Sequence, residues 1–177
     1  EKLANLVLNA YVYLHGQPAL AAAEAARENG SSPNVVIASG VAILGKKVVQ
    51  KSIDAASALL DLFQHTKLMD PAEKFDYSTV LSEAKKHKDA LVASAEGHYA
   101  GKMLACLEKA GKSVFVDFCK DFAKQEKGHL TMDILVAAVW LTLGWNSLRG
   151  KRISKEKLST LPWHSRIFSS IIGLAAR

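Results

Sequence analysis

The sequence lacks several features that would quickly assign it to a class. Of its 177 residues only two are cysteine, and aromatic side chains make up 7%. Two cysteines do not form a disulfide framework, and the helical periodicity around Cys106 and Cys119 predicts two buried core thiols. The scarcity of aromatics, most of them patterned onto apolar helix faces, leaves few rings to stack on nucleic-acid bases.

The chain also lacks an apolar run long enough to cross a bilayer, which requires about 20 residues. The longest such run, Ile134 to Trp145, covers 12 residues and is bounded by Asp133 and Asn146. A short helix that is apolar on every side is typical of the centre of a bundle. We therefore expect residues 132–148 to form a buried central helix. The alternative is a helix that switches between a bundle and a membrane.

Catalytic motifs are incomplete. Residues 40–47 match a phosphate-binding loop in the first seven positions, but Lys47 stands where a Ser or Thr hydroxyl must hold magnesium. Glu126 and His129 have the spacing of a di-iron motif, but Gly128 between them predicts a helix end. No serine lies in a strand-turn-helix elbow of the kind that acyl transfer needs. These absences predict that the chain is not an enzyme.

Two further candidates favour ordinary structural roles. Asp61 and His65 are four residues apart, with Asp54 on the same helix face, but an exposed ion pair is commoner than a metal site with two visible ligands. Cys119 lies between Phe115 and Phe122 on one face, which favours an inert buried thiol over a nucleophile. We expect no metal ion.

What the chain does contain is helical throughout. A length of 177 residues, with 49% hydrophobic and 23% charged residues, fits one packed domain over residues 1–177. Ser113 and Thr131 are predicted to begin helices, and another helix is predicted from about Ser78 to Glu96. Ser154 is predicted to begin a short turn before Pro162. Residues 34–44 are apolar and could be helix or strand. The predicted fold is all-α: a compact single-domain bundle of about eight helices around residues 132–148.

The last helix is predicted to be amphipathic. One stripe carries large apolar side chains, and the opposite stripe carries small or polar ones. The apolar stripe contains Trp163, Ile167, Phe168, Ile171 and Ile172, and the opposite one contains Arg166, Ser169, Ser170 and Gly173.

Positive charge gathers directly after the central helix. Residues 149–157 hold five Lys or Arg and one Glu, a net charge of +4 out of +6 for the chain. Such a cluster attracts anionic partners. We therefore predict a non-enzymatic binding or assembly protein that contacts an anionic protein or membrane surface. The predicted contact residues are Arg149, Lys151, Arg152, Lys155 and Lys157.

Two alternatives stay open at this point. The same cations could bind nucleic-acid phosphates, as in a nucleocapsid-type RNA- or DNA-binding bundle. An apolar pocket between helices could instead hold a hydrophobic ligand. If that ligand were a haem or chlorophyll-type pigment, His87 and His98 would be its axial ligands. Both histidines lie on or beside a helical seam formed by Val80, Ala84, Leu91 and Ala95.

Three short stretches bear on the pigment alternative. Asp70-Pro71, residues 83–88 and residues 116–120 resemble, in that order, segments of peridinin-chlorophyll proteins. The likeness requires gaps, contains no specific motif and assigns no family. The leading expectation is that the chain carries no cofactor, and the sequence assigns no cellular compartment.

Overall fold

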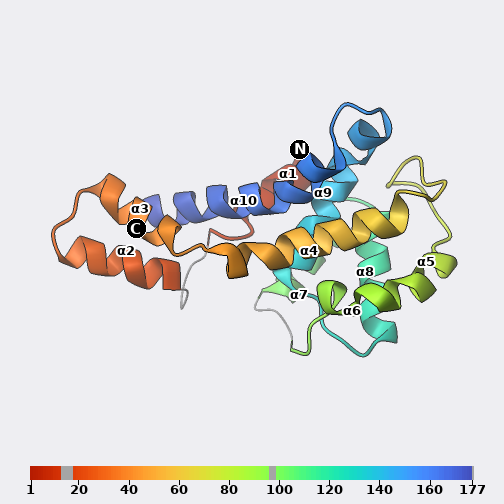
Figure 1. Ribbon diagram of the computed structural model, residues 1–177, viewed down its shortest axis with the longest axis horizontal. Coiled ribbons are helices and arrows are strands. Elements are labelled where there is room, and N and C mark those ends of the chain that lie inside the picture. Colours follow the sequence, from red (N-terminus) through yellow and green to blue (C-terminus); the bar gives the residue numbers. More distant parts are fainter. Residues whose placement is uncertain (13–17, 96–98, 177) are drawn as a thin grey trace.

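A computed structural model describes residues 1–12, 18–95 and 99–176 of the chain (Figure 1). Within these residues the regular structure is helical, apart from one isolated antiparallel bridge between Ala93 and His129. The helices in chain order are α1 (Lys2–Asn9), α2 (Pro18–Glu28), α3 (Pro33–Ala42), α4 (Lys46–Phe63), α5 (Ser78–Glu83), the 3₁₀-helix η1 (Ala84–His87), α6 (Lys88–Leu91), α7 (Ala100–Ala110), α8 (Val114–Gln125), α9 (Met132–Arg149) and α10 (Lys155–Ala175). The prediction of an all-α bundle is confirmed.

The central helix is α9, as predicted. It packs against α4, α8 and α10 along its length and also contacts α1 and α7. Ile134 to Val139 are all buried, and Trp145 has no exposed surface. A helix surrounded in this way can be apolar on most sides, because most of its length meets other helices; Leu143 in its second half is exposed. No helix in the described part of the chain is both long and apolar enough to span a membrane.

Aromatic rings fill the core beside α9. The ring of Phe63 on α4 lies 5.0 Å from that of Phe115 and 5.1 Å from that of Phe118, both in edge-to-face geometry. Phe115 in turn meets the ring of Trp145 at 5.2 Å. The indole N–H of Trp145 donates to the carbonyl of Leu68 at 3.1 Å, so its one polar group is satisfied inside the core. These contacts join α4, α8 and α9.

Two helices begin at the predicted capping residues, Ser113 and Thr131, whereas Ser154 begins the long helix α10 and not the predicted short turn. The hydroxyl oxygens of Ser113, Thr131 and Ser154 accept hydrogen bonds from backbone amides three residues later. Each bond satisfies an amide that the first helical turn leaves without a partner. Residues 34–44, which could have been helix or strand, lie mostly in the helix α3 (Pro33–Ala42).

One predicted helix is wrong in extent. The helix expected from about Ser78 to Glu96 is three short pieces, α5, η1 and α6, and it ends at Leu91. From Val92 the backbone is extended, and Ala93 exchanges two hydrogen bonds of 2.9 Å with His129. This pairing with the segment before α9 takes the chain out of the helix. A side chain at Gly128 would come within 2.8 Å of Val92, so the close approach requires glycine there.

At one end of the molecule α2 and α3 form a hairpin that extends beyond the main bundle (Figure 1). The hairpin packs on the C-terminal half of α10, where Leu20, Ala23 and Leu174 make a small second core. Gly40 permits this contact, because a Cβ there would lie 2.6 Å from Leu174 Cδ1 and 2.8 Å from the carbonyl of Ala19. The burial of residues along α10 shows which side of that helix faces inward: Ser165, Ser169, Ser170 and Gly173 are buried.

Candidate functional site

A polar cavity of about 400 Å³ lies beside the N-terminal end of α9. Four segments line it: the first half of α4, the end of α6, the extended residues after α6, and the first turn of α9. Its charged and hydroxyl-bearing lining residues are Lys51, Asp54, Asp89, Ser94, Thr131 and Asp133. A second described cavity, of about 410 Å³, also contains three carboxylates, Glu73, Asp76 and Asp117, with two lysines, but it does not include Asp133.

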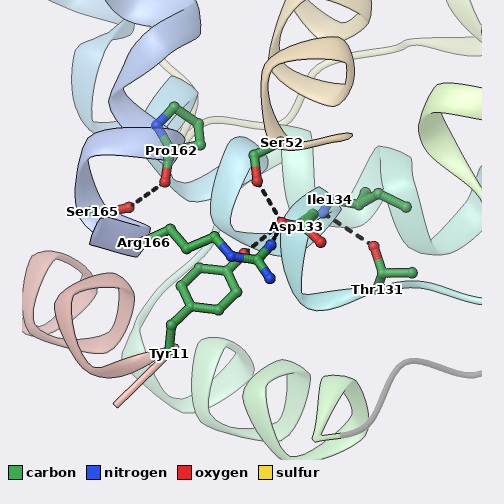
Figure 2. A network of polar contacts seen from close by, with 8 residues as sticks. All are labelled: Tyr11, Ser52, Thr131, Asp133, Ile134, Pro162, Ser165 and Arg166. Atoms are coloured by element: carbon green, nitrogen blue, oxygen red, sulfur yellow. Dashed lines mark hydrogen bonds and ion pairs between the residues drawn. The ribbon is translucent and has the colours of Figure 1, made fainter. Parts of the chain in front are cut away.

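Asp133 is the best-anchored residue of this cavity (Figure 2). Its Oδ1 accepts hydrogen bonds from the phenol of Tyr11 at 2.9 Å and from the guanidinium of Arg166 at 2.8 Å, and it also accepts one from the hydroxyl of Ser52. These partners come from α4, α10 and the turn that follows α1. Asp133 therefore holds three distant segments of the chain together at the start of α9.

The surroundings of Tyr11 fit this structural role. Burial and the negative charge of Asp133 raise the pKa of its phenol well above the ordinary value. The guanidinium of Arg166 stacks 4.6 Å from the centre of the Tyr11 ring, which adds a cation–π contact to its ion pair with Asp133. A phenol with a raised pKa keeps its proton, so it donates to Asp133 at neutral pH.

The remaining charged groups of the cavity are available for chemistry. Lys51, Asp54 and Asp89 are exposed at its rim. The amide of Gln50 donates to Asp54 Oδ1 at 2.7 Å and orients that carboxylate. A lysine can bind a substrate anion, and a carboxylate can accept a proton from a hydroxyl. The arrangement suits proton transfer at Asp54 or Asp89 beside an anionic group held by Lys51.

The basic residues predicted to bind a partner lie elsewhere. Arg149 is at the C-terminal end of α9, so roughly 26 Å of helix separates it from the cavity at 1.5 Å per residue. Lys151, Arg152 and Lys157 are exposed, whereas Lys155 is partly covered and forms an ion pair with Asp61. The structure does not bring this cluster to the cavity, and its role in binding a partner stays a prediction.

The two histidines proposed as pigment ligands are not brought together. His87 closes the 3₁₀-helix η1 and is partly exposed. His98 lies outside the described residues. The residues that line the described cavities include no histidine.

The candidates for metal or phosphate chemistry take structural roles. Asp61 pairs with Lys155, and Glu126 pairs with Lys88 at 2.8 Å. Within the described residues no group of three or more His, Cys, Asp and Glu side chains could hold a metal ion. The glycine-rich stretch from residue 40 begins inside α3 and is preceded by helix, not by the strand that a phosphate-binding loop needs.

The two cysteines differ from each other. Cys119 is buried, as predicted, and burial raises the pKa of its thiol to about 12. Cys106 is exposed on α7, so the prediction that both thiols are buried is wrong for this residue. The exposed side of α7 has only the short α1 as its neighbour there, and that helix leaves the Cys106 side chain uncovered.

Sequence reasoning missed the Asp133 network, whose members lie far apart along the chain. Tyr11 and Asp133 are 122 residues apart, and Ser52 and Asp133 are 81 apart. A signal was nevertheless present. Asp133 is a charged residue directly before the most apolar segment, and Arg166 is the only Lys, Arg, Asp or Glu among residues 158–176. Isolated charges at the edge of a core usually have a partner.

Comparison with known proteins gives one informative likeness. No protein-family model matches the chain, and no curated protein matches it. Among solved structures, citryl-CoA lyase from Hydrogenobacter thermophilus matches with a TM-score of 0.63 at 17% sequence identity. The match covers 98% of this chain and 66% of that chain, so this chain spans about two thirds of that protein's length. At this identity the likeness shows the fold.

The likeness overturns the functional prediction made from the sequence. We predicted a non-enzymatic binding protein, yet the fold of nearly the whole chain is one that an enzyme uses. The expectation of no enzyme is wrong on this finding, and so is the assignment of a non-enzymatic function. Binding of a partner by residues 149–157 stays a prediction. The nucleic-acid and pigment alternatives belonged to the same non-enzymatic interpretation and are withdrawn with it. The error came from treating missing sequence motifs as missing chemistry, although acid–base sites need only a few side chains that meet in space.

Proposed function

We propose that the chain is an enzyme, or the part of one, that acts as a lyase on an acyl thioester of coenzyme A. The observation that carries this proposal is the likeness of 98% of the chain to citryl-CoA lyase. The cavity at the N-terminal end of α9 supports it, because a charged cavity of about 400 Å³ suits a small acyl group. We place the reaction in that cavity.

Each lining group has a role in this proposal. Lys51 provides positive charge for a substrate carboxylate or for the oxygen on which negative charge develops when a bond beside a carbonyl breaks. Asp54 and Asp89 are the candidates to accept a hydroxyl proton. Asp133 is neutralised by Arg166 and acts as a positioning residue that fixes the start of α9.

The position of the cavity at the N-terminal end of α9 supports this choice of site. The N-terminal end of α9 carries partial positive charge, which favours a bound anion. The carboxylate of Asp133 offsets part of that charge, and its ion pair with Arg166 in turn cancels the carboxylate. The local balance around a substrate is then set by Lys51 against Asp54 and Asp89.

The test is turnover of citryl-CoA by the full chain, followed by chromatography as the loss of citryl-CoA and the appearance of a shorter acyl-CoA thioester. We expect measurable cleavage, and Lys51→Met should lower kcat/KM by about a hundredfold or more. Lys157→Met is the matched control, because it removes an exposed lysine at the far end of α9 and should leave the rate unchanged. Absence of turnover, or equal rates for both variants, would contradict the proposal.

A further inference from the structure

The amphipathic helix α10 is inserted with its polar stripe inward. Ser165, Ser169 and Ser170 are 2%, 0% and 1% exposed, whereas Phe168 and Ile172 are 62% and 49% exposed. A surface helix of a globular protein ordinarily turns its large apolar side chains to the core. Small residues on the inner side instead let α10 approach its neighbours closely: the hydroxyl of Ser169 donates to the carbonyl of Leu8 at 2.5 Å. Three large side chains, Phe168, Ile171 and Ile172, are left exposed on the outer side.

The neighbouring helix α3 has the same excess of uncovered apolar surface. It contains no charged residue, yet among its ten residues only Gly40 is buried. Val35 is 48% exposed, and Ile43, which caps the helix, is 47% exposed. A helix that is apolar on all sides needs cover on all sides, and α2 and α10 cover only part of α3.

These exposed side chains are concentrated in one part of the molecule. Eight large hydrophobic residues are exposed in the described chain, and six of them belong to α1, α3 with its cap, or α10. The three helices adjoin, since α10 packs against both α1 and α3. We call the six residues the apolar end: Leu8, Val35, Ile43, Phe168, Ile171 and Ile172.

The area of the apolar end agrees with a protein interface. Phe168 alone leaves on the order of 100 Å² uncovered, because a full aromatic side chain presents roughly 150–250 Å². Six such residues, each roughly half exposed, together present on the order of 400 Å², at the upper range for one patch on a monomer. A standard interface buries about 800 Å² per partner, so the patch and its polar border would supply the core and rim of one.

Charge decides which partner fits. Residues 167–176 and 33–43 contain no charged side chain. An anionic macromolecule or lipid headgroup would find no cation to pair with in these two segments. Two copies of the chain, each carrying a net charge of +6, would repel through most other surfaces but can meet through a neutral one. An uncharged apolar face is also self-complementary, as a two-fold contact requires.

We infer that the apolar end is the interface with a second copy of this chain. The contact is isologous: the outer face of α10, defined by Phe168, Ile171 and Ile172, packs against the same end of the partner, with Val35 and Ile43 at its border. This inference is independent of the proposed function, because the cavity at the start of α9 is lined by none of these residues.

Sedimentation velocity of the full chain tests it, at concentrations from about 1 to 100 µM. We expect a species of twice the 19.1 kDa monomer mass. The double variant Phe168→Gln/Ile172→Gln should raise the dissociation constant at least a hundredfold, since central apolar anchors dominate interfaces. Val35→Gln, at the border, should raise it about tenfold or less. Circular dichroism of each variant establishes that it is folded.

The matched control is Met69→Gln/Leu143→Gln. Met69 and Leu143 are 65% and 38% exposed and lie outside the apolar end, so this variant should remain dimeric. A wild-type monomer throughout the concentration range overturns the inference, and so does a folded Phe168→Gln/Ile172→Gln variant that stays dimeric. Flotation of a monomeric wild type with neutral phosphatidylcholine vesicles, lost in that double variant, would assign the face to a membrane instead and would also overturn it.

Discussion

The guanidinium of Arg166 donates to the carboxylate of Asp133 across 2.8 Å and ties the middle of α10 to the first turn of α9. The two side chains are only 13% and 17% exposed. We expect Arg166→Met to lower the free energy of unfolding by about 2–4 kcal/mol, because it leaves a largely buried carboxylate without its cation. Urea unfolding measures the change.

The control for that prediction is an exposed ion pair. Lys120 and Glu108 lie 2.5 Å apart but are 36% and 53% exposed. Lys120→Met should therefore lower the free energy of unfolding by less than about 1 kcal/mol. Equal effects of Lys120→Met and Arg166→Met would show that the Asp133 network does not stabilise the junction of α9 and α10.

Stability should fall at alkaline pH through the buried phenols. Burial raises the pKa of Tyr11 and Tyr77, and a carboxylate partner adds to the shift in each case, Asp133 for the first and Asp121 for the second. A phenol that binds its proton more tightly in the folded state stabilises the protein fully below its unfolded pKa of about 10, and this contribution is lost as the pH rises above that value. We expect the free energy of unfolding to decline above about pH 10.

Spectrophotometric titration near 295 nm gives an independent measure of the same effect. Tyr11, one of the four tyrosines, should ionise only as the protein unfolds, and Tyr77 should ionise at a higher pH than a free phenol. Tyr11→Phe should make the alkaline decline in stability shallower. If all tyrosines of the folded protein ionise together near pH 10, the described environments of Tyr11 and Tyr77 are wrong.

The two thiols should differ sharply in reactivity. The pKa of Cys119 is about 12, so very little of its reactive thiolate forms at pH 8, and burial excludes reagents as well. Cys106 is exposed. With an excess of iodoacetamide we expect one alkyl group on the native protein and two on the denatured protein by mass spectrometry. Peptide mapping should place the native label on Cys106.

Gly144 allows α9 and α10 to approach closely. A Cβ at this position would overlap Cδ1 of Leu158, a buried residue on α10. We expect Gly144→Ala to lower the free energy of unfolding by about 1–3 kcal/mol through overpacking. Leu158→Val should relieve part of that strain, so the double variant should cost less than the two single variants combined. Additive costs would mean that the helices separate instead of clashing.

The architecture could be predicted because it depends on local patterns. The apolar run from Ile134 and the capping residues Ser113 and Thr131 each act within a few residues, and each took the expected structure. The broken helix after Ser78 could not be predicted in this way. Its end is set by the pairing of Ala93 with His129, and the sequence does not show that these residues meet.

The candidate site could not be predicted because it depends on tertiary contacts. Lys51, Asp89 and Asp133 lie on three helices that are far apart in sequence, and no fixed spacing connects them. The basic cluster from Arg149 is apparent in the sequence because its charges lie close together along the chain. A high density of charge along the chain does not indicate where a cavity lies. The orientation of α10 was also beyond sequence patterns, since amphipathicity separates two faces without saying what lies against each.

The backbone pairing between Ala93 and His129, here called the clasp, offers a way to follow ligand binding at the cavity in solution. It joins a lining segment of the cavity to the loop that leads into α9 through two backbone hydrogen bonds of 2.9 Å. Those two amide protons can exchange with solvent deuterium only when the clasp opens. Their exchange rates therefore report whether the cavity is occupied. A molecule bound against the lining segment would slow the exchange of both amides together, while the exchange of amides at the distant apolar end would not change.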